Sequence, residues 1–103
     1  MTTKRKRLSP IHPGQILRED LADEGVSLNQ LARDLRVPMN RISAIVNGQR
    51  AITADTAMRL ARYFGTSSQY WMNLQTTYEL DLAERRFAAK IDRDVIPRQA
   101  QAA

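Results

Sequence analysis

The sequence predicts an all-α fold, and three observations support this prediction. Apolar residues recur at helical spacing in five segments separated by turn residues. No segment alternates with strand period over a useful length, and the nearest candidate, Val95-Ile96, is followed at once by Pro97. The 103 residues suffice for one domain with a modest core. We therefore expect a single domain of five helices.

The first two helices are bounded by residues with a clear local preference. Pro13 begins the first helix, because the missing N–H of proline has no partner in a first turn anyway. Gly25 ends it, since glycine adopts the left-handed conformation of a C-terminal cap. Ser27 caps the second helix, which runs through Leu35, and the spacing of Ser27 and Gln30 is that of a capping box.

The third helix opens at Pro38, runs to about Asn47 and stops at Gly48. Across these first three helices, the apolar residues at helical spacing are expected to face inward. These residues are Ile16, Leu17, Leu21, Leu28, Leu31, Ala32, Leu35, Ile42, Ile45 and Val46.

The fourth helix is capped by Thr53 and runs through Phe64 to a terminating Gly65. Thr66 and Gln69 then form a capping-box pair before a long fifth helix. The predicted inward residues of the fourth helix are Met58, Leu60, Ala61 and Phe64. The fifth helix carries Trp71, Leu74, Tyr78 and Leu82 at helical spacing, then Phe87 and Ile91. Its last apolar residues either extend an apolar stripe beyond the core or fold back to cover it.

Composition narrows the class of protein. The chain has no cysteine, which excludes disulfides and thiolate metal sites and fits a cytoplasmic location. No apolar run is long enough to span a membrane. The net charge of +5 is uneven, because residues 1–65 carry 11 Lys or Arg against 6 Asp or Glu, while residues 66–103 carry 5 of each. A basic excess confined to one part of the chain is typical of a polyanion-binding protein.

The run from Ser27 to Arg50 points to the use of that charge. Its two short amphipathic helices are separated by only about four residues, Leu35-Arg36-Val37-Pro38. Helices joined so tightly cross steeply, and the second is presented outward as in a helix-turn-helix. Such a helix fits the major groove of DNA, where asparagine pairs with adenine and arginine with guanine.

The predicted DNA-binding residues share one motif: the start of its first helix, its turn, its second helix and the loop that follows. Caps and helix ends donate N–H groups to phosphates, and the second helix reads base edges. Ser27 and Asn47 have the alternative of acting only as helix-end residues, and Arg41 of being a solvated surface side chain. The set is Ser27, Asn29, Arg36, Pro38, Met39, Asn40, Arg41, Ser43, Ala44, Asn47, Gln49 and Arg50.

This run, LNQLARDL-RVPMNRISAIVNGQR, resembles the Xre or Cro/phage-repressor type of helix-turn-helix, whose fold is that of the lambda repressor. Within that superfamily the chain is similar to the HigA (VapI-like) antitoxins over roughly residues 9–82. The resemblance is carried by residues beyond the motif as well. They are His12-Pro13-Gly14, Ile52-Thr53, Asp55-Thr56-Ala57, Arg59-Leu60-Ala61, Phe64-Gly65-Thr66-Ser67, Trp71-Met72-Asn73-Leu74-Gln75 and Tyr78-Glu79-Leu80.

The resemblance implies a DNA-binding antitoxin of a type II toxin-antitoxin system. Such a protein represses its own operon and neutralises a HigB-like RNase toxin. A homodimer would place two recognition helices in successive major grooves of an inverted-repeat operator. The chain departs from phage repressors at Leu28, where they usually carry glutamine, and at Met39 and Asn40, which replace their glutamine pairs. Their operator preference therefore does not transfer.

Three alternatives remain: a stand-alone Xre-family repressor with no toxin, a helical interaction module with a vestigial DNA surface, and an enzyme. No catalytic constellation, cofactor motif or metal-ligand cluster supports an enzyme. The sole histidine, His12, is expected to have a structural role at the start of the first helix. In domain terms we expect a basic flexible arm at 1–9, the helix-turn-helix domain at 10–91, with its motif at about 27–47, and a tail at 92–103.

Overall fold

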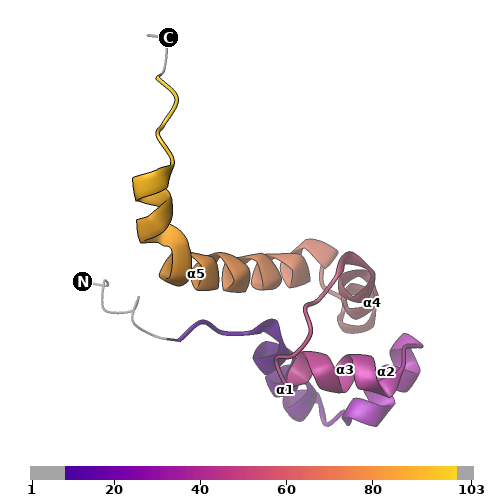
Figure 1. Cartoon of the computed structure of the whole chain (residues 1–103). Helices are drawn as coiled ribbons and strands as arrows, with labels where there is room; N and C mark the ends of the chain where they lie inside the picture. Colours follow the sequence, from indigo (N-terminus) through magenta and orange to yellow (C-terminus); the bar gives the residue numbers. More distant parts are fainter. Residues whose placement is uncertain (1–8, 100–103) are drawn as a thin grey trace.

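The computed structural model in Figure 1 describes residues 9–99 and folds them as helices alone, which confirms the all-α prediction. The predicted basic arm, apart from its last residue, and the end of the predicted tail lie outside the described residues. The final helix runs past the predicted domain boundary at residue 91. The helices are α1 (Pro13–Glu24), α2 (Leu28–Leu35), α3 (Met39–Val46), α4 (Ala54–Phe64) and α5 (Ser68–Asp94).

Several helix ends follow the residues that predicted them. Pro13 is the first residue of α1, and the Nδ1 atom of His12 accepts a hydrogen bond from the Gly14 N–H at 2.8 Å. His12 is thus the cap of α1, which confirms its structural role. The Ser27 hydroxyl accepts from the Gln30 N–H at 3.1 Å, and Gly25 closes α1 with a φ of 68°. These bonds satisfy N–H and C=O groups that a helix end otherwise leaves unpaired.

Two of the predicted caps differ in the structure. The cap of α5 is Ser67, whose hydroxyl accepts from the Tyr70 N–H at 3.0 Å, so the prediction of Thr66 was wrong. The Thr66 hydroxyl instead accepts a hydrogen bond from the Trp71 indole at 2.9 Å. Thr53 does precede α4, but its side chain makes no capping hydrogen bond. Spacing alone did not distinguish the adjacent hydroxyls of residues 66 and 67.

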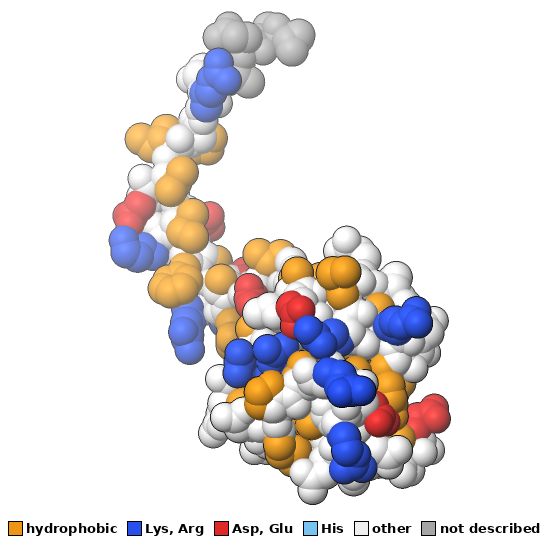
Figure 2. Space-filling model, turned by 90° about the vertical axis from the view of Figure 1, so that its right-hand side faces the viewer, with side chains coloured by type: hydrophobic (Ala, Val, Ile, Leu, Met, Phe, Trp, Pro, Cys, Tyr) orange, Lys and Arg blue, Asp and Glu red, His pale blue; other side chains and the backbone are white. Residues whose placement is uncertain are grey.

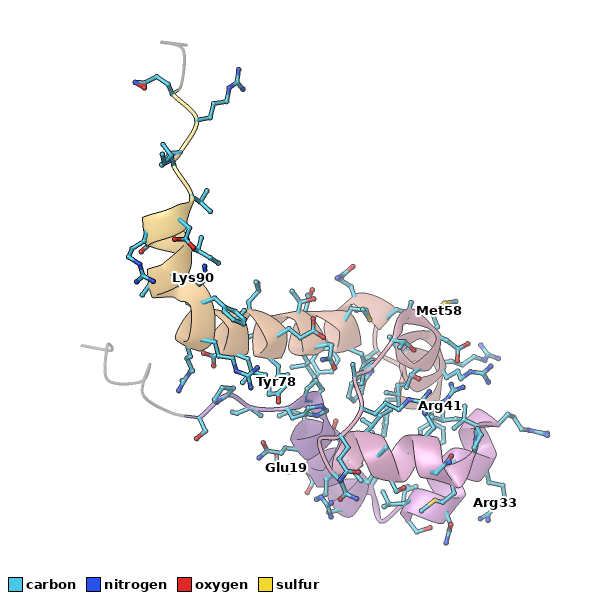
Figure 3. All side chains as sticks on the ribbon, viewed as in Figure 1. Glu19, Arg33, Arg41, Met58, Tyr78 and Lys90 are labelled. Carbon is cyan, nitrogen blue, oxygen red and sulfur yellow. The ribbon has the colours of Figure 1, made fainter. Side chains whose placement is uncertain are left out.

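The core lies among all five helices and confirms most of the predicted inward residues. Trp71, Leu60 and Ile45 are fully buried, and Ile52 joins them from the loop before α4. Met58 was predicted to face inward but is 64% exposed. It lies one position beyond the buried Ala57 and points off the outer side of α4 (Figure 3). The buried apolar set is Leu17, Leu21, Leu31, Ala32, Leu35, Ile42, Ile45, Val46, Ile52, Ala57, Leu60, Ala61 and Trp71.

The long α5 helix has two parts with different surroundings. Its first half packs against α4 and α1, while its last turns bend away from the other helices, as Figure 1 shows. Phe87 and Ile91 in this second part are 47% and 52% exposed. Of the two possibilities for these residues, the structure therefore shows the extended stripe and not a fold-back onto the core.

The start of α1 contacts the backbone of α3 at Gly14. A Cβ atom added at residue 14 would lie 1.9 Å from the carbonyl oxygen of Ile45 and 2.9 Å from the Cα of Val46. No side chain fits in that space, so only glycine allows α1 to approach α3 this closely. This contact fixes the inner face of α3 and leaves its opposite face outward.

Gly14→Ala should therefore lower the free energy of unfolding by about 3 kcal/mol, because the added methyl collides with rigid backbone. The measurement is urea denaturation at one fixed protein concentration. Gly25→Ala is the matched control, since nothing lies within 4 Å of its Cβ position and only its φ of 68° is unfavourable. That control should lose about 1 kcal/mol. An equal or smaller loss at residue 14 would contradict the close contact.

Candidate nucleic-acid interface

The turn between α2 and α3 consists of residues 36–38 and is held by backbone hydrogen bonds. The Val37 N–H donates to the Ala32 carbonyl at 3.0 Å, and the Arg36 N–H donates to the Arg33 carbonyl at 3.2 Å. Arg36 has a φ of 61° and is the one non-glycine residue of the described range with a positive φ. A left-handed conformation costs a residue other than glycine about 1–2 kcal/mol. An exposed arginine thus occupies a position where glycine would fit better.

One face of α3 is buried and the opposite face is open. Ile42, Ile45 and Val46 have at most 5% of their surface exposed and pack toward α1 and α2. At about 100° per residue, the side opposite these three is centred on Asn40 and Ala44. It continues to the predicted residues Ser43 and Asn47, and Met39 lies at its edge with 38% exposed. The structure thus brings these predicted residues together on one outward surface.

Arg41 lies at the other edge of that face, beside α4, as Figure 3 shows. Its NH1 atom donates to Asp55 Oδ2 at 2.8 Å, and 25% of its side chain is exposed. Asp55 also accepts from Arg59 Nε at 2.9 Å. The hydrogen bonds from Arg59 and Arg41 hold the pKa of the Asp55 carboxyl below its usual value. Arg41 is therefore not the freely solvated side chain that one sequence interpretation allowed.

The loop after α3 is held at both ends. The Gln49 N–H donates to the Ala44 carbonyl at 2.8 Å, which closes the end of α3. Further along, the Ile52 N–H donates at 2.8 Å to the buried side chain of Gln75 on α5. Between these two points Gln49 and Arg50 are exposed. The loop therefore presents two of the predicted residues next to the open face of α3.

His12 supports the same loop from behind. Its imidazole hydrogen-bonds to the backbone of Arg50, and its ring meets Tyr78 edge-on with 4.8 Å between ring centroids. Burial lowers the pKa of His12 below the usual value, and the Arg50 bond partly opposes this. His12 as a whole is only 8% exposed, and this burial favours the neutral form of its imidazole.

The remaining predicted residues lie near the start of α2, in the turn and at the end of α3. Asn29 and Pro38 are exposed, and the Ser27 hydroxyl is already used in capping α2. Asn47 Oδ1 accepts a hydrogen bond from Arg18 NH2 at 3.1 Å, which brings a basic residue of α1 beside the end of α3.

Four residues that sequence reasoning left out of the candidate site take part in its geometry. Arg18 lies beside Asn47, and Gln75 holds the loop. Asp55 contacts Arg41, and Arg59 contacts the end of α2. The spacing of Asp55 and Arg59, four apart in a helix, was the one sequence signal for an ion pair among these four residues. Nothing in the sequence indicated that Arg41 would join it.

The surface charge of this end of the molecule is mixed but rich in basic groups. Figure 2 shows several basic side chains on the face toward the viewer, with acidic side chains between them, and those before α5 are all arginines. In residues 9–99 no three His, Asp or Glu side chains gather as a metal site would require. No helix in this range is apolar enough over sufficient length to cross a bilayer.

Comparison with known proteins identifies the same motif. A helix-turn-helix family model, HTH_3, matches residues 17–71. Virulence-associated protein I of Dichelobacter nodosus is 51% identical over 82 residues, which cover 79% of this chain and 76% of that protein.

Two solved structures resemble the whole fold. An addiction module antidote protein of the HigA family from Coxiella burnetii is 49% identical with a TM-score of 0.85, covering 88% of this chain and 100% of that one. The Pseudomonas aeruginosa antitoxin HigA, solved with the higBA promoter, is 45% identical with a TM-score of 0.84, covering 87% and 99%.

The family model and the two solved structures match most of the described residues, including the helix-turn-helix with its outward α3. The chain belongs to the HigA (VapI-like) antitoxin family, within the Xre/Cro-type helix-turn-helix proteins.

Proposed function

We propose that this chain is a sequence-specific DNA-binding antitoxin that represses its own operon and neutralises a HigB-like RNase toxin. The observation that carries the DNA half is the open face of α3, flanked by Arg36, Arg41 and Arg50. A relative of the same fold that was solved with promoter DNA supports it.

The proposed contacts divide by position. The centre of the open face, with Asn40, Ser43 and Ala44, would lie against base edges, where an amide can pair with adenine. Met39 at its edge would touch a thymine methyl. The phosphates would be bound by the basic and amide groups around this face and by the N–H groups at the start of α2. These are Ser27, Asn29, Arg36, Asn47, Gln49 and Arg50. Pro38 has no N–H to donate and would meet the base edges at the start of α3.

A homodimer is part of the proposal. Leu80, Phe87 and Ile91 lie seven and four residues apart on α5, so they share one helix face, and each is at least 47% exposed. Burying this face against a second copy would remove apolar surface from water. A two-fold dimer would set two α3 helices about 34 Å apart, in successive major grooves of an inverted-repeat operator.

The toxin half of the proposal rests on family membership. Relatives are named as antidote and antitoxin proteins, which supports a protein partner for this chain as well. A stand-alone repressor would use the same DNA surface. It would differ from an antitoxin only in having no toxin partner.

Arg36→Gly tests the DNA surface through two opposite effects. Glycine removes the left-handed strain at residue 36, so the free energy of unfolding should rise by about 0.5–1 kcal/mol. Loss of the cation should weaken binding to all DNA sequences and reduce the salt slope by about one unit. Arg86→Ala, which makes the same charge change on the exposed part of α5, should leave the slope unchanged. A more stable variant with undiminished affinity would remove Arg36 from the phosphate contacts.

Co-expression with the product of the neighbouring reading frame tests the toxin half. If that product is a small basic RNase, the full-length chain should restore growth to cells expressing it and should co-purify with it. Rescue by repression is separated from rescue by binding by driving the toxin from an unrelated promoter. Growth arrest that persists in the presence of the folded, DNA-binding chain would favour the stand-alone repressor.

A further inference from the structure

We propose that Asp55 is a specificity-determining positioning residue, which holds the Arg41 guanidinium for base contact and restrains it from binding phosphate. This inference rests on the proposed DNA binding. A network of hydrogen bonds on the protein surface joins three helices around Asp55. Asp55 Oδ2 accepts from Arg41 NH1 at 2.8 Å and from Arg59 Nε at 2.9 Å. Arg59 NH1 donates at 2.8 Å to the carbonyl of Leu35, the last residue of α2.

Asp55 is an isolated acidic residue within a basic stretch of the sequence. Asp55 is the only Asp or Glu between Asp34 and Glu79, a stretch that contains five arginines. Its side chain is 57% exposed, so its ion pairs are solvated and contribute little to folding. A carboxylate beside a surface that binds phosphates would also weaken binding. Its presence therefore calls for a role in how the arginines are used.

The geometry of the pair gives that role. NH1 is the guanidinium nitrogen that contacts Asp55, and the described residues supply no other hydrogen bond to the Arg41 side chain. The opposite edge, formed by Nε and NH2, has no hydrogen-bond partner among the described residues. This edge carries two parallel N–H donors, the arrangement that matches O6 and N7 of guanine. An arginine already fixed at one edge loses less conformational freedom when the other edge binds.

The charge of the network points the same way. Asp55 offsets one of the two positive charges of Arg41 and Arg59, so the group carries about one net positive charge. With Asn at residue 55, both guanidinium groups would be uncompensated and free to turn toward phosphates. Sequence-independent binding should then strengthen while base discrimination weakens, which are changes of opposite sign.

The helix dipole supplies a competing explanation. Asp55 lies in the first turn of α4, where a carboxylate stabilises the helix through its dipole. If this were its only role, replacing Asp55 would lower the stability of the protein. The affinities for specific and non-specific DNA would then fall together. The ratio of specific to non-specific affinity distinguishes the two roles.

The experiment compares full-length wild type, Asp55→Asn, Asp55→Glu, Arg41→Ala and the Asp55→Asn/Arg41→Ala double variant. Each is titrated against the DNA upstream of its own gene and against a scrambled duplex of equal length, over a range of salt. Asp81→Asn is the matched control, because Asp81 makes the same four-apart ion pair at 2.9 Å with Arg85 on α5. Thermal melts establish that each variant is folded at the temperature of titration.

We expect Asp55→Asn to lower the specific-to-scrambled affinity ratio about tenfold, the scale of one lost bidentate base contact. Its affinity for scrambled DNA and its salt slope should rise, the slope by up to one unit. Asp55→Glu, which keeps the carboxylate, should recover part of the ratio. Asp81→Asn should behave as wild type, and Asp55→Asn should change the ratio no further once Arg41 is alanine.

A ratio within twofold of wild type for Asp55→Asn would overturn the inference while leaving the proposed function standing. So would an equal fall in the Arg41→Ala background, because Asp55 would then act independently of Arg41. A wild-type chain that binds its own upstream DNA no better than the scrambled duplex would overturn the proposed function, and this inference with it.

Discussion

The close contact between the start of α1 and the backbone of α3 determines how the recognition motif is built. Gly14 lies against the carbonyl of Ile45, where no side chain fits, and α3 is thereby held with Ile42 and Val46 inward. Eight residues of helix are too few to be stable alone, so α3 exists because it is packed in this way. Its open face is the consequence: once one side is fixed against the core, the side that carries Asn40 has only solvent or a ligand to meet.

Hydrogen bonds and ion pairs then fix the loop and the arginines around that face. Gln75 reaches from α5 to the backbone of Ile52, so the long helix supports the loop after α3 through a buried amide. On the other side, Asp55 connects α3 to α4, and Arg59 connects α4 to the end of α2. An exposed ion pair contributes only about 0.2–1 kcal/mol. The value of the second set of bonds therefore lies in fixing the direction of Arg41 more than in holding the fold together.

Features that depend on residues close together in the chain, such as helix ends, could be predicted from the sequence. Features that depend on how the helices pack could not. Gly25 closes α1 as expected, because the left-handed conformation is a local property of glycine. Met58 has the spacing of an inward residue but is exposed, since periodicity does not reveal how far the neighbouring helices extend over α4. The role of Gln75 was hidden because a buried amide has no signature in an apolar pattern. The pairing of Arg41 with Asp55 spans 14 residues and depends on how α3 meets α4.

Methylation interference on the DNA upstream of the gene tests whether the open face of α3 enters the major groove. Methylation of guanine N7 blocks major-groove contacts, while methylation of adenine N3 on the same DNA reports on the minor groove. If α3 enters the groove, two clusters of methylated guanines, about one helical turn apart on one face of the duplex, should prevent binding of the full-length chain. Specific binding that is unaffected by guanine N7 methylation would contradict it.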